Sequence, residues 1–352
     1  MTLLEGLGWP ASLVFGAVVR LRAWCYRKGI FRAHRLNGTV ISVGNLTVGG
    51  TGKTPMVIWL VERLIAGGKR TGVLTRGYRG FLGRFSPDAP KTQLSYHKPQ
   101  LVFGDEVCLL LRRLPAQPQF MIGVGADRYA RGRELEQQGV EWFVLDDGFQ
   151  HLQLARDVDI VLLDATDPFG GGHLLPAGRL REPKSALARA DMIVITRSSH
   201  APAVETIVRR HTDAPIFYAQ TTLEGLWQAM GGVATPEPDW AARKLFAFCG
   251  IGNPAAFFDD LHRCGLQVTG RAHFRDHHHY SQSDADELES RALASGAEAL
   301  VCTEKDVFNL AHAQFQRLPV CYAKISLQAP NADEFMETLI GLVFQKRSQA
   351  AR

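Results

Sequence analysis

The 352-residue sequence contains no C-x-x-C pair, no internal repeat and no low-complexity tract. Its six cysteines lie mostly inside apolar runs, which favours buried thiols in a reducing, cytoplasmic compartment over disulfides or a zinc site. A concentrated basic patch is missing beyond the N-terminal region, so the net charge of +5 argues against a nucleic-acid partner. With 46% hydrophobic and 21% charged residues, the composition is that of a globular protein, and the length predicts two domains.

The sequence also lacks an uninterrupted apolar run of about 20 residues, the length that crosses a membrane. An apolar stretch, residues 11–19, is followed at once by arginines interspersed with aromatic residues. A signal peptide places its positive charge before the apolar segment, so this order argues against one. Aromatic and basic residues together favour a helix in the headgroup region of an anionic leaflet. We therefore expect residues 1–37 to form a membrane-associating helix, and a packed helix with a solvated basic side is the alternative.

From residue 38 onward, short apolar runs alternate with helix-like segments, which predicts an α/β domain with a mostly parallel sheet over residues 38–214. The first clear helix is expected over residues 54–68. The expected strands span residues 39–45, 70–76, 119–126, 141–147, 158–165 and 191–197. Polar residues stand at or just beyond their carboxyl ends, where open α/β sheets bind ligands: Asn45, Arg76, Asp127, Asp146, Asp147, Asp164 and Arg197. We expect these side chains to converge on one cleft.

A second, smaller α/β domain is expected over residues 231–318, because a stretch rich in Gly, Pro and charge marks a boundary before it. Two alternating segments that resemble each other, residues 215–230 and 319–328, flank this domain. We interpret them as a two-stranded linker between the domains, with two unrelated edge strands as the alternative. Residues 329–352 are expected to form a C-terminal helix.

The segment Gly44–Pro55, GNLTVGGTGKTP, has the composition of a phosphate-binding loop. Such a loop needs backbone N–H groups at a helix N-terminus, a lysine for the outer phosphates and a hydroxyl for magnesium. Thr47 stands where the usual pattern places its first glycine, but glycines soon after it supply the unusual backbone angles. We expect the nucleotide-binding residues to be Thr47, Val48, Gly49, Gly50, Thr51, Gly52, Lys53 and Thr54. A tight glycine turn with an incidental lysine is the alternative.

Two acidic pairs are candidates for the chemistry. Asp146 and Asp147 end an apolar strand, where P-loop enzymes place an acid near the metal, although a helix cap would also explain them. Asp105 and Glu106 begin an amphipathic helix, where favourable interaction with the helix dipole already accounts for acidic residues. On the residues alone, only the first pair is assigned to Mg²⁺.

Three other patterns argue against different ligands. The lysine of the sequence TEKD, residues 303–306, is one position late for a guanine-binding signature, which argues against GTP. The Gly250-x-Gly252 turn lacks the acidic residue of a dinucleotide site and is interpreted as a tight turn. The histidines between residues 273 and 279 lack the partners of a zinc site. A use of His277 at a phosphoryl-transfer site is the interpretation that remains.

Taken together, nine motifs spread over almost the whole chain resemble the tetraacyldisaccharide 4'-kinases of lipid A biosynthesis. They are SVGNLTVGGTGKTP, TRGYRG, GDE, GADR, LDDGFQH, LLPAGRLREP, FCGIGNP, FRDHHHY and TEKD. The resemblance implies ATP-dependent phosphorylation of the 4'-hydroxyl of a lipid A disaccharide 1-phosphate, giving lipid IVA. It also implies action at the cytoplasmic face of a Gram-negative inner membrane, and a P-loop domain joined to a smaller domain by a two-stranded linker.

The resemblance also implies roles for individual residues. Lys53 would contact the outer phosphates and Thr54 the magnesium ion, while Asp105 would act as the catalytic base with help from His277. The remaining implied metal-site residues are Glu106, Asp146 and Asp147, and the candidate substrate-phosphate contacts are Arg76, Arg79 and Arg128, with surface salt bridges as their alternative. Two other functions stay open at this point: a soluble P-loop kinase of a small metabolite, and a non-catalytic nucleotide-binding switch.

Overall fold

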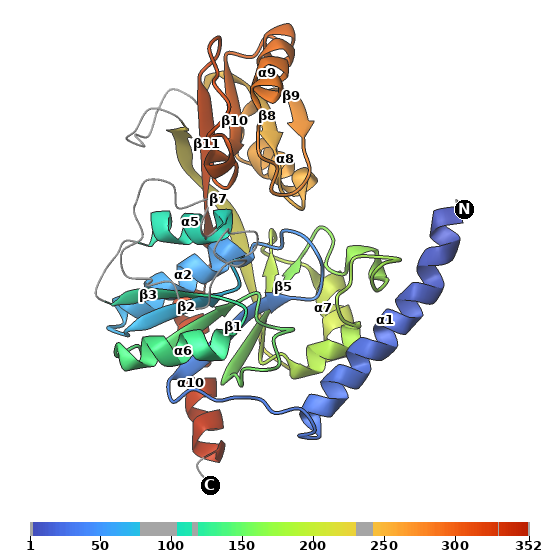
Figure 1. Ribbon diagram of the computed structural model, residues 1–352, viewed down its shortest axis with the longest axis vertical. Coiled ribbons are helices and arrows are strands. Elements are labelled where there is room, and N and C mark those ends of the chain that lie inside the picture. The colour runs from blue at the N-terminus through green and yellow to red at the C-terminus, as the bar shows by residue number, and fades with distance from the viewer. Residues whose placement is uncertain (1–2, 78–103, 115–118, 230–241, 330, 351–352) are drawn as a thin grey trace. The chain divides into compact units, whose positions relative to one another are not determined.

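The computed structural model describes residues 3–77, 104–114, 119–229, 242–329 and 331–350, and its fold is α/β with a large, mostly parallel sheet (Figure 1). The chain forms two compact units. Unit 1 comprises Met1–Arg76, Leu114–Gln220 and Leu327–Arg352, and unit 2 comprises Gly77–Arg113 and Thr221–Ser326.

Unit 1 is built on strands in the order β3-β2-β4-β1-β5-β6-β7, and each pairing between neighbours is parallel. The strands are β1 (Thr39–Asn45), β2 (Thr71–Thr75), β3 (Phe120–Val124), β4 (Trp142–Asp146), β5 (Val158–Asp164), β6 (Met192–Thr196) and β7 (Ile216–Gln228). Every residue of the central strands β1 and β5 is buried, as expected of strands covered on both faces. The predicted parallel sheet is therefore confirmed.

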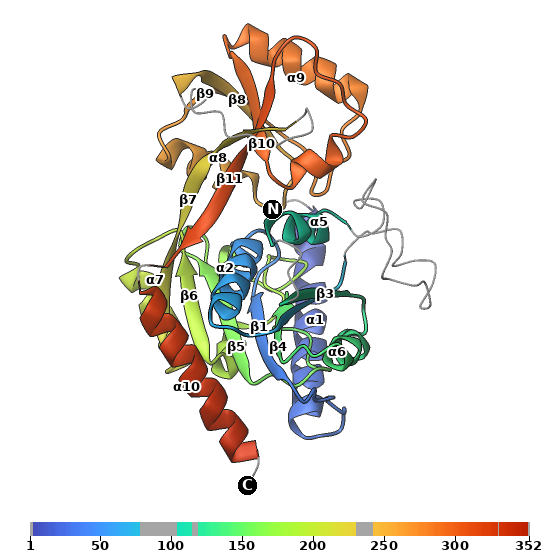
Figure 2. The same ribbon diagram turned by 90° about the vertical axis from the view of Figure 1, so that its left-hand side faces the viewer.

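Helices cover the two faces of this sheet, and α2 and α6 lie on opposite faces in Figure 1. The helical segments of unit 1 are α1 (Leu3–Arg27), α2 (Lys53–Ala66), α6 (Arg128–Gln137), α7 (Pro202–Val208), α10 (Ala332–Ala350) and the short 3-10 turns η1 (Gly170–Gly172) and η2 (Lys184–Arg189). Helix α10, at the lower left of Figure 2, packs through the Phe335 ring, whose centre lies 5.1 Å from that of Trp59 and 5.0 Å from that of Phe217. Lys346 of α10 also pairs with Asp191 at 2.6 Å.

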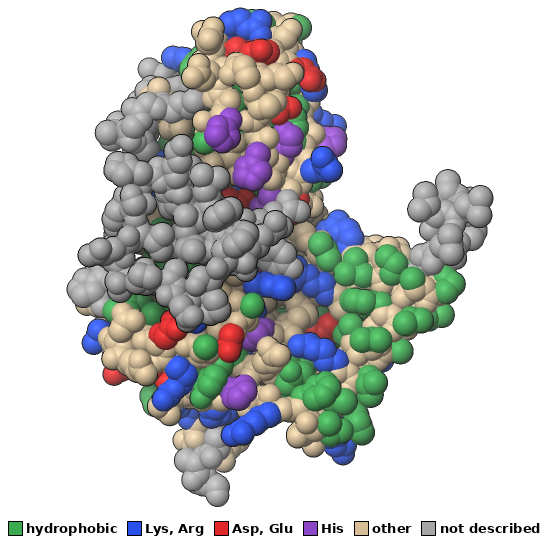
Figure 3. Space-filling model, in the orientation of Figure 1, with side chains coloured by type: hydrophobic (Ala, Val, Ile, Leu, Met, Phe, Trp, Pro, Cys, Tyr) green, Lys and Arg blue, Asp and Glu red, His purple; other side chains and the backbone are tan. Residues whose placement is uncertain are grey.

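Helix α1 is only partly packed against unit 1. Ser12 Oγ donates to the Leu174 carbonyl at 2.9 Å, and Arg22 Nη1 donates to the Gln150 carbonyl at 3.0 Å. Its outer face is strongly apolar, and Figure 3 shows the hydrophobic side chains gathered along it. Among the helices that the structure describes, neither α1 nor any other has the length and apolar character needed to cross a membrane.

Unit 2 carries the strands β8 (Lys244–Cys249), β9 (Gln267–His273), β10 (Ala299–Thr303) and β11 (Val320–Gln328), in the order β7-β11-β10-β8-β9. Its helical segments are α5 (Asp105–Arg113), α8 (Pro254–Arg263), α9 (Gln282–Ala294) and the 3-10 turn η4 (Asp306–Asn309). The pairings of β10 with β8 and β11, and of β8 with β9, are parallel. Apolar clusters lie on both faces of this sheet, so unit 2 has a core of its own.

Helix α5 belongs to unit 2, whereas the sequence analysis assigned it to the domain over residues 38–214. The reason lies in its last turn, where Arg113 donates to Glu304 at 2.8 Å and to Glu224 at 3.0 Å. Arg112 donates to the Tyr322 hydroxyl at 2.6 Å, and its guanidinium lies 4.4 Å from the ring centre. These partners are more than 100 positions away along the chain, so local pattern could not indicate them.

All six cysteines are free, and five of them are buried, Cys264 being the exposed one. Burial raises the pKa of the Cys108 thiol to about 12, so this thiol stays protonated at neutral pH.

Candidate active site

The loop between β1 and α2 in unit 1 is held from both sides. Asn45 Nδ2 donates to Thr51 Oγ1 at 2.9 Å, and Thr196 Oγ1 donates to the Thr51 carbonyl at 3.2 Å. Gly52 then adopts a left-handed conformation, with φ of 84°, and α2 begins at Lys53 with no side chain capping its first N–H groups. Backbone N–H groups without a side-chain cap at a helix N-terminus are the donors that phosphate-binding loops use.

The first residues of the predicted loop have partners within the protein. Thr47 is buried and forms an antiparallel bridge with Leu180. The Val48 N–H donates to the Arg179 carbonyl at 2.8 Å, while the Val48 side chain is exposed. This pairing attaches the loop to the segment that follows η1. The phosphate contacts predicted for Thr47 and Val48 stay predictions.

Lys53 and Asp147 form the charged centre of the loop region. Lys53 Nζ lies 3.6 Å from Asp147 Oδ1, and Arg181 Nη1 contacts the two carboxylate oxygens at 2.8 and 2.7 Å. Burial favours the neutral acid, but the charges of Lys53 and Arg181 outweigh it and lower the pKa of Asp147 to about 2. Asp147 is therefore ionised throughout the physiological range.

Asp146, at the end of β4, has a different environment. Its Oδ2 accepts a hydrogen bond from Thr75 Oγ1 at 3.1 Å. The buried Arg128 donates to the Asp146 carbonyl at 3.4 Å, and its Nη1 lies 3.0 Å from His151 Nδ1. Burial and the neighbouring Arg128 lower the pKa of His151 to about 4, so this imidazole is neutral at pH 7. His151 therefore adds no second positive charge beside Arg128.

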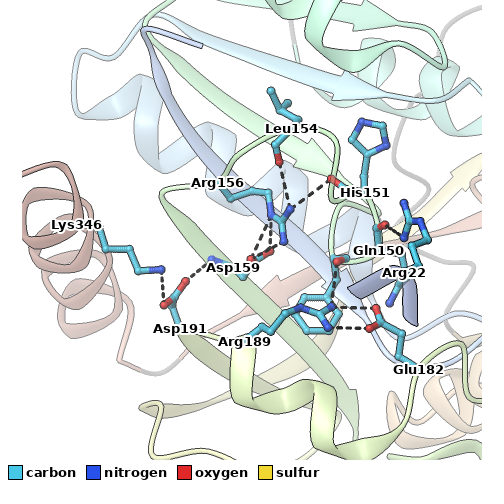
Figure 4. Close-up of polar contacts among 11 residues, drawn as sticks. Arg22, Gln150, His151, Leu154, Arg156, Asp159, Glu182, Arg189, Asp191 and Lys346 are labelled. Atoms are coloured by element: carbon cyan, nitrogen blue, oxygen red, sulfur yellow. Dashed lines mark hydrogen bonds and ion pairs between the residues drawn. The ribbon is translucent and has the colours of Figure 1, made fainter. Parts of the chain in front are cut away.

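The segment after the two acids is fastened by arginines, as Figure 4 shows. Arg189 bonds Glu182 at 2.8 and 3.0 Å and lies 4.4 Å over the Phe149 ring. Arg156 bonds Asp159 at 2.9 Å and the Leu154 carbonyl at 3.1 Å. The Arg189 contact lies two positions beyond Asp147, whose φ of 49° is unusual for a residue with a side chain.

The other polar residues at the strand ends do not all lie in the loop region. Arg197 pairs with Asp164 and also donates to the Gly50 carbonyl at 3.5 Å, so both belong to the loop region. Asp127 instead caps helix α6 by accepting from the Ala130 N–H at 2.9 Å. Arg76 is exposed just after β2. Arg79 lies outside the described residues.

The second candidate centre lies within unit 2, where α5 begins. Asp105 Oδ2 is 2.8 Å from His277 Nδ1, and Asp276 Oδ2 is 3.7 Å from His277 Nε2. Burial favours a neutral Asp105, but its hydrogen bond with His277 and the charge of Lys305 lower its pKa. The same hydrogen bond, opposed by burial, raises the pKa of His277. The two residues therefore form an ion pair over a broad range of pH.

Glu106 and Lys305 form a neighbouring pair, with Lys305 Nζ 2.9 Å from Glu106 Oε1. Sequence analysis considered Lys305 only as a displaced guanine-binding residue and missed this contact. It also assigned no role to Arg181, whose sole signal was its position inside the motif LLPAGRLREP.

The residues predicted to hold magnesium are divided between the two units. Thr54, the second residue of α2, shares unit 1 with Asp146 and Asp147, and Glu106 lies in unit 2. Within the described ranges, no three His, Cys, Asp or Glu side chains gather as a metal cluster. His278, beside the paired His277, lies 3.1 Å from Asp284.

Comparison with known proteins gives one consistent result. The sequence matches the family described as Tetraacyldisaccharide-1-P 4'-kinase over residues 4–343. A tetraacyldisaccharide 4'-kinase of Geobacter metallireducens is 40% identical over 338 residues, which cover 94% of this chain and 96% of that protein. The corresponding protein of Geobacter sulfurreducens is 41% identical over 330 residues, covering 92% and 89%. The crystal structure of "apo" form LpxK from Aquifex aeolicus in complex with ATP superimposes with a TM-score of 0.71 at 28% identity, covering 97% of this chain and 100% of that chain.

Proposed function

Because this chain belongs to the tetraacyldisaccharide 4'-kinase family and phosphorylates the 4'-position of a lipid A precursor with ATP, we propose which residues perform the transfer. The loop Gly44–Pro55 holds the ATP phosphates, and Asp105 with His277 accepts the proton of the attacking hydroxyl. The observation that carries the first assignment is the left-handed Gly52, which turns the loop directly into the N-terminus of α2. On this assignment unit 1 is a P-loop domain.

Lys53 is the residue that reaches the outer phosphates. Its ammonium group already lies beside a carboxylate, at 3.6 Å from Asp147, and Arg181 shares that carboxylate. A phosphate entering this region meets Lys53, Arg181 and the N–H groups of α2 together. Charge neutralisation and positioning are the main needs of phosphoryl transfer, because the protein does little covalent chemistry in it.

The residues assigned to Mg²⁺ fit that ion chemically, since a threonine hydroxyl and carboxylates are the oxygen ligands it prefers. Thr54 and Asp146 are the direct ligands from unit 1, and Asp147 and Glu106 support them, because both are paired with cationic side chains in this structure. Held by these residues, Mg²⁺ would supply positive charge that neutralises the phosphate oxygens. The side chain of Lys53 holds the same phosphates from the helix.

Asp105 receives the proton of the sugar hydroxyl. A carboxylate is a weak base, but it can accept a proton that leaves late, when the bond to phosphorus is well advanced. His277 keeps the Asp105 carboxylate oriented through its contact of 2.8 Å, and the same contact raises the pKa of His277. His277 thus serves as the orienting partner.

The substrate phosphate is met by arginines. We assign Arg128, Arg76 and Arg79 to the 1-phosphate of the lipid A disaccharide or to the γ-phosphate. Arg128 supports this assignment because it is buried beside the Asp146 carbonyl and contributes to the low pKa of Asp147, which marks a region of positive potential. A guanidinium binds phosphate with two parallel hydrogen bonds, which gives both charge and orientation.

Helix α1 attaches the enzyme to the cytoplasmic face of the inner membrane. Its outer face exposes 70% of Leu13, 65% of Val14, 58% of Val18 and 60% of Leu21, residues that share one side of a helix. Such a face, followed by arginines, binds an anionic lipid surface through apolar burial and charge.

Changing Leu13, Val18 and Leu21 together to Glu should release the protein from vesicles that contain anionic lipid, because it places charge on the apolar face. The matched control is Leu293→Glu, which changes an exposed leucine on α9 of unit 2. Co-sedimentation with vesicles measures the effect. Retention of the triple variant at the level of the control would contradict the role of α1.

Strands β7 and β11 form the two-stranded linker between the units. Each strand divides between them, β7 after Gln220 and β11 after Ser326. The strands are neighbours, and Thr222 Oγ1 lies 3.0 Å from Ser326 Oγ. A ribbon of this kind lets unit 2 change position without unfolding either core.

Transfer of labelled γ-phosphate from ATP to the lipid A precursor in mixed micelles tests the assignment of the loop. Wild-type enzyme should label the 4'-position, and Lys53→Ala should not. Labelling by Lys53→Ala at the wild-type rate would overturn the assignment.

A further inference from the structure

Asp306 is a fully buried carboxylate in unit 2 that the proposed reaction does not use. It accepts hydrogen bonds from the Gly250 N–H at 2.8 Å, the Tyr280 hydroxyl at 2.8 Å and Thr303 Oγ1 at 2.5 Å. The three donors come from the end of β8, from the segment before α9 and from the end of β10. Asp306 therefore joins three parts of unit 2 at one point.

One of these bonds leads directly to His277. The carbonyl of Gly250, whose N–H is held by Asp306, accepts the N–H of His277 at 2.9 Å. His277 has a φ of 58°, in the left-handed region that residues with side chains seldom occupy. Such a conformation persists only where the surroundings impose it. The backbone hydrogen bond from His277 to Gly250 is one such constraint.

The contact between the two segments is also close. A Cβ atom added at Gly250 would lie 3.1 Å from the Arg275 carbonyl oxygen and 3.1 Å from His278 Cβ. Tyr280 packs edge-on against His278, with ring centres 5.0 Å apart, and against Phe248 at 5.3 Å. The segment that carries His277 therefore has little room to shift while Asp306 and Tyr280 stay bonded.

We propose that Asp306 and Tyr280 are positioning residues for phosphoryl transfer, which act through Gly250 to set where the His277 imidazole meets Asp105. This inference rests on the proposed role of the Asp105–His277 pair. The charged groups that face His277 are Asp105, Asp276 and Lys305. Asp306 and Tyr280 touch none of the reacting atoms on this account.

The test uses the full-length enzyme with Tyr280→Phe, which removes one hydroxyl, and Asp306→Asn, which replaces an acceptor by a donor. The matched control is Glu289→Gln. Glu289 is also a buried carboxylate of unit 2, and it accepts from the backbone N–H groups of Arg317 at 2.5 Å and Leu318 at 2.9 Å. It therefore anchors a different loop.

For each variant, kcat in mixed micelles and Tm are measured, together with the pKa of His277 from its imidazole NMR signals. Hydrogen-bond partners that orient metal ligands typically contribute about 10–100-fold to activity, and we take this factor for partners that orient His277. We expect Asp306→Asn to lower kcat by about that factor, Tyr280→Phe by less, and both to move the pKa of His277 toward its ordinary value. Glu289→Gln should lower Tm while leaving kcat and that pKa unchanged.

Wild-type kcat in His277→Ala would overturn the role of the pair, and this inference with it. A second outcome separates the two claims. In it, His277→Ala loses kcat, while Asp306→Asn and Tyr280→Phe keep the kcat of the Glu289→Gln control and the wild-type pKa of His277. That result would overturn this inference alone.

Discussion

Two aspartates that pair with a cation, Asp147 in unit 1 and Asp105 in unit 2, differ in what surrounds them. Asp147 faces Lys53 and Arg181, neither of which loses its charge near neutral pH, and its pKa falls to about 2. Asp105 faces His277, an imidazole whose charge depends on pH and whose pKa this contact raises. Asp147 therefore has partners of fixed charge, whereas Asp105 has a partner whose charge depends on pH.

This difference indicates that phosphate binding and proton transfer are carried out by different units. Phosphate binding needs permanent charge, and unit 1 supplies it with lysine, arginine and the N-terminus of a helix. Proton transfer needs a positioned acceptor, and unit 2 supplies the Asp105 carboxylate with His277 as its orienting partner. Variants of each centre should therefore fail in different ways.

The largest effect is expected from Lys53→Ala. Removing a cation from the outer phosphates should lower kcat by about 10³–10⁵-fold, the contribution of a cationic side chain that stabilises the charge on a transferring phosphoryl group. Rates are measured with labelled ATP and a lipid A precursor. The control Lys69→Ala, which changes a lysine just beyond the C-terminal end of α2, should keep the wild-type rate. Near wild-type turnover in Lys53→Ala would refute a P-loop function.

A somewhat smaller loss is expected from Asp105→Asn and from His277→Ala. Each should lower kcat by about 10²–10⁴-fold, the usual contribution of a general base, and leave the Kd for ATP nearly unchanged. Isothermal titration with ATP and steady-state rates separate the two quantities. If Asp105 were only a partner of the α5 dipole, its replacement would cost about 0.3–1 kcal/mol of stability and spare kcat.

The smallest effect concerns stability against pH. The lowered pKa of Asp105 gives stability that is lost as pH falls through that lowered value. The raised pKa of His277 gives stability that is complete below about 6.5 and is lost as pH rises through the raised value. The Tm difference between wild type and His277→Gln should therefore be largest from about pH 3.9 to 6.5 and shrink above it.

The control for this measurement is His279→Gln, because His279 is exposed two positions away. Its Tm difference from wild type should stay small across the same range. A Tm difference for His277→Gln that grows as pH rises above neutrality would have the wrong sign for the ion pair.

Much of unit 1 could be predicted from the sequence because its signals are local. The strand expected over residues 39–45 is found as Thr39–Asn45, and the helix expected over 54–68 as Lys53–Ala66. Continuous apolar runs that end in Gly, Asn or Asp identify buried parallel strands without any knowledge of distant partners. The position of Lys53 at the start of α2 followed from the same pattern.

The centre in unit 2 could not be predicted in this way. Asp105 and His277 are 172 positions apart, and Arg113 holds α5 through Glu304, 191 positions away. Without the family resemblance, Asp105 was explained equally well as an acid at a helix start. Lys305 was considered only as part of an imperfect guanine signature, because its contact with Glu106 depends on the folded arrangement of unit 2.

The central claim is that Asp105 and His277 act as one unit, and the double variant tests it most directly. The kcat of Asp105→Asn/His277→Ala is measured beside the two single variants in mixed micelles, with ATP binding and Tm as controls. Because residues that act together are strongly non-additive, the double variant should be little worse than the poorer single variant. Losses in kcat that multiply would contradict the account, since they would show that the two side chains contribute independently.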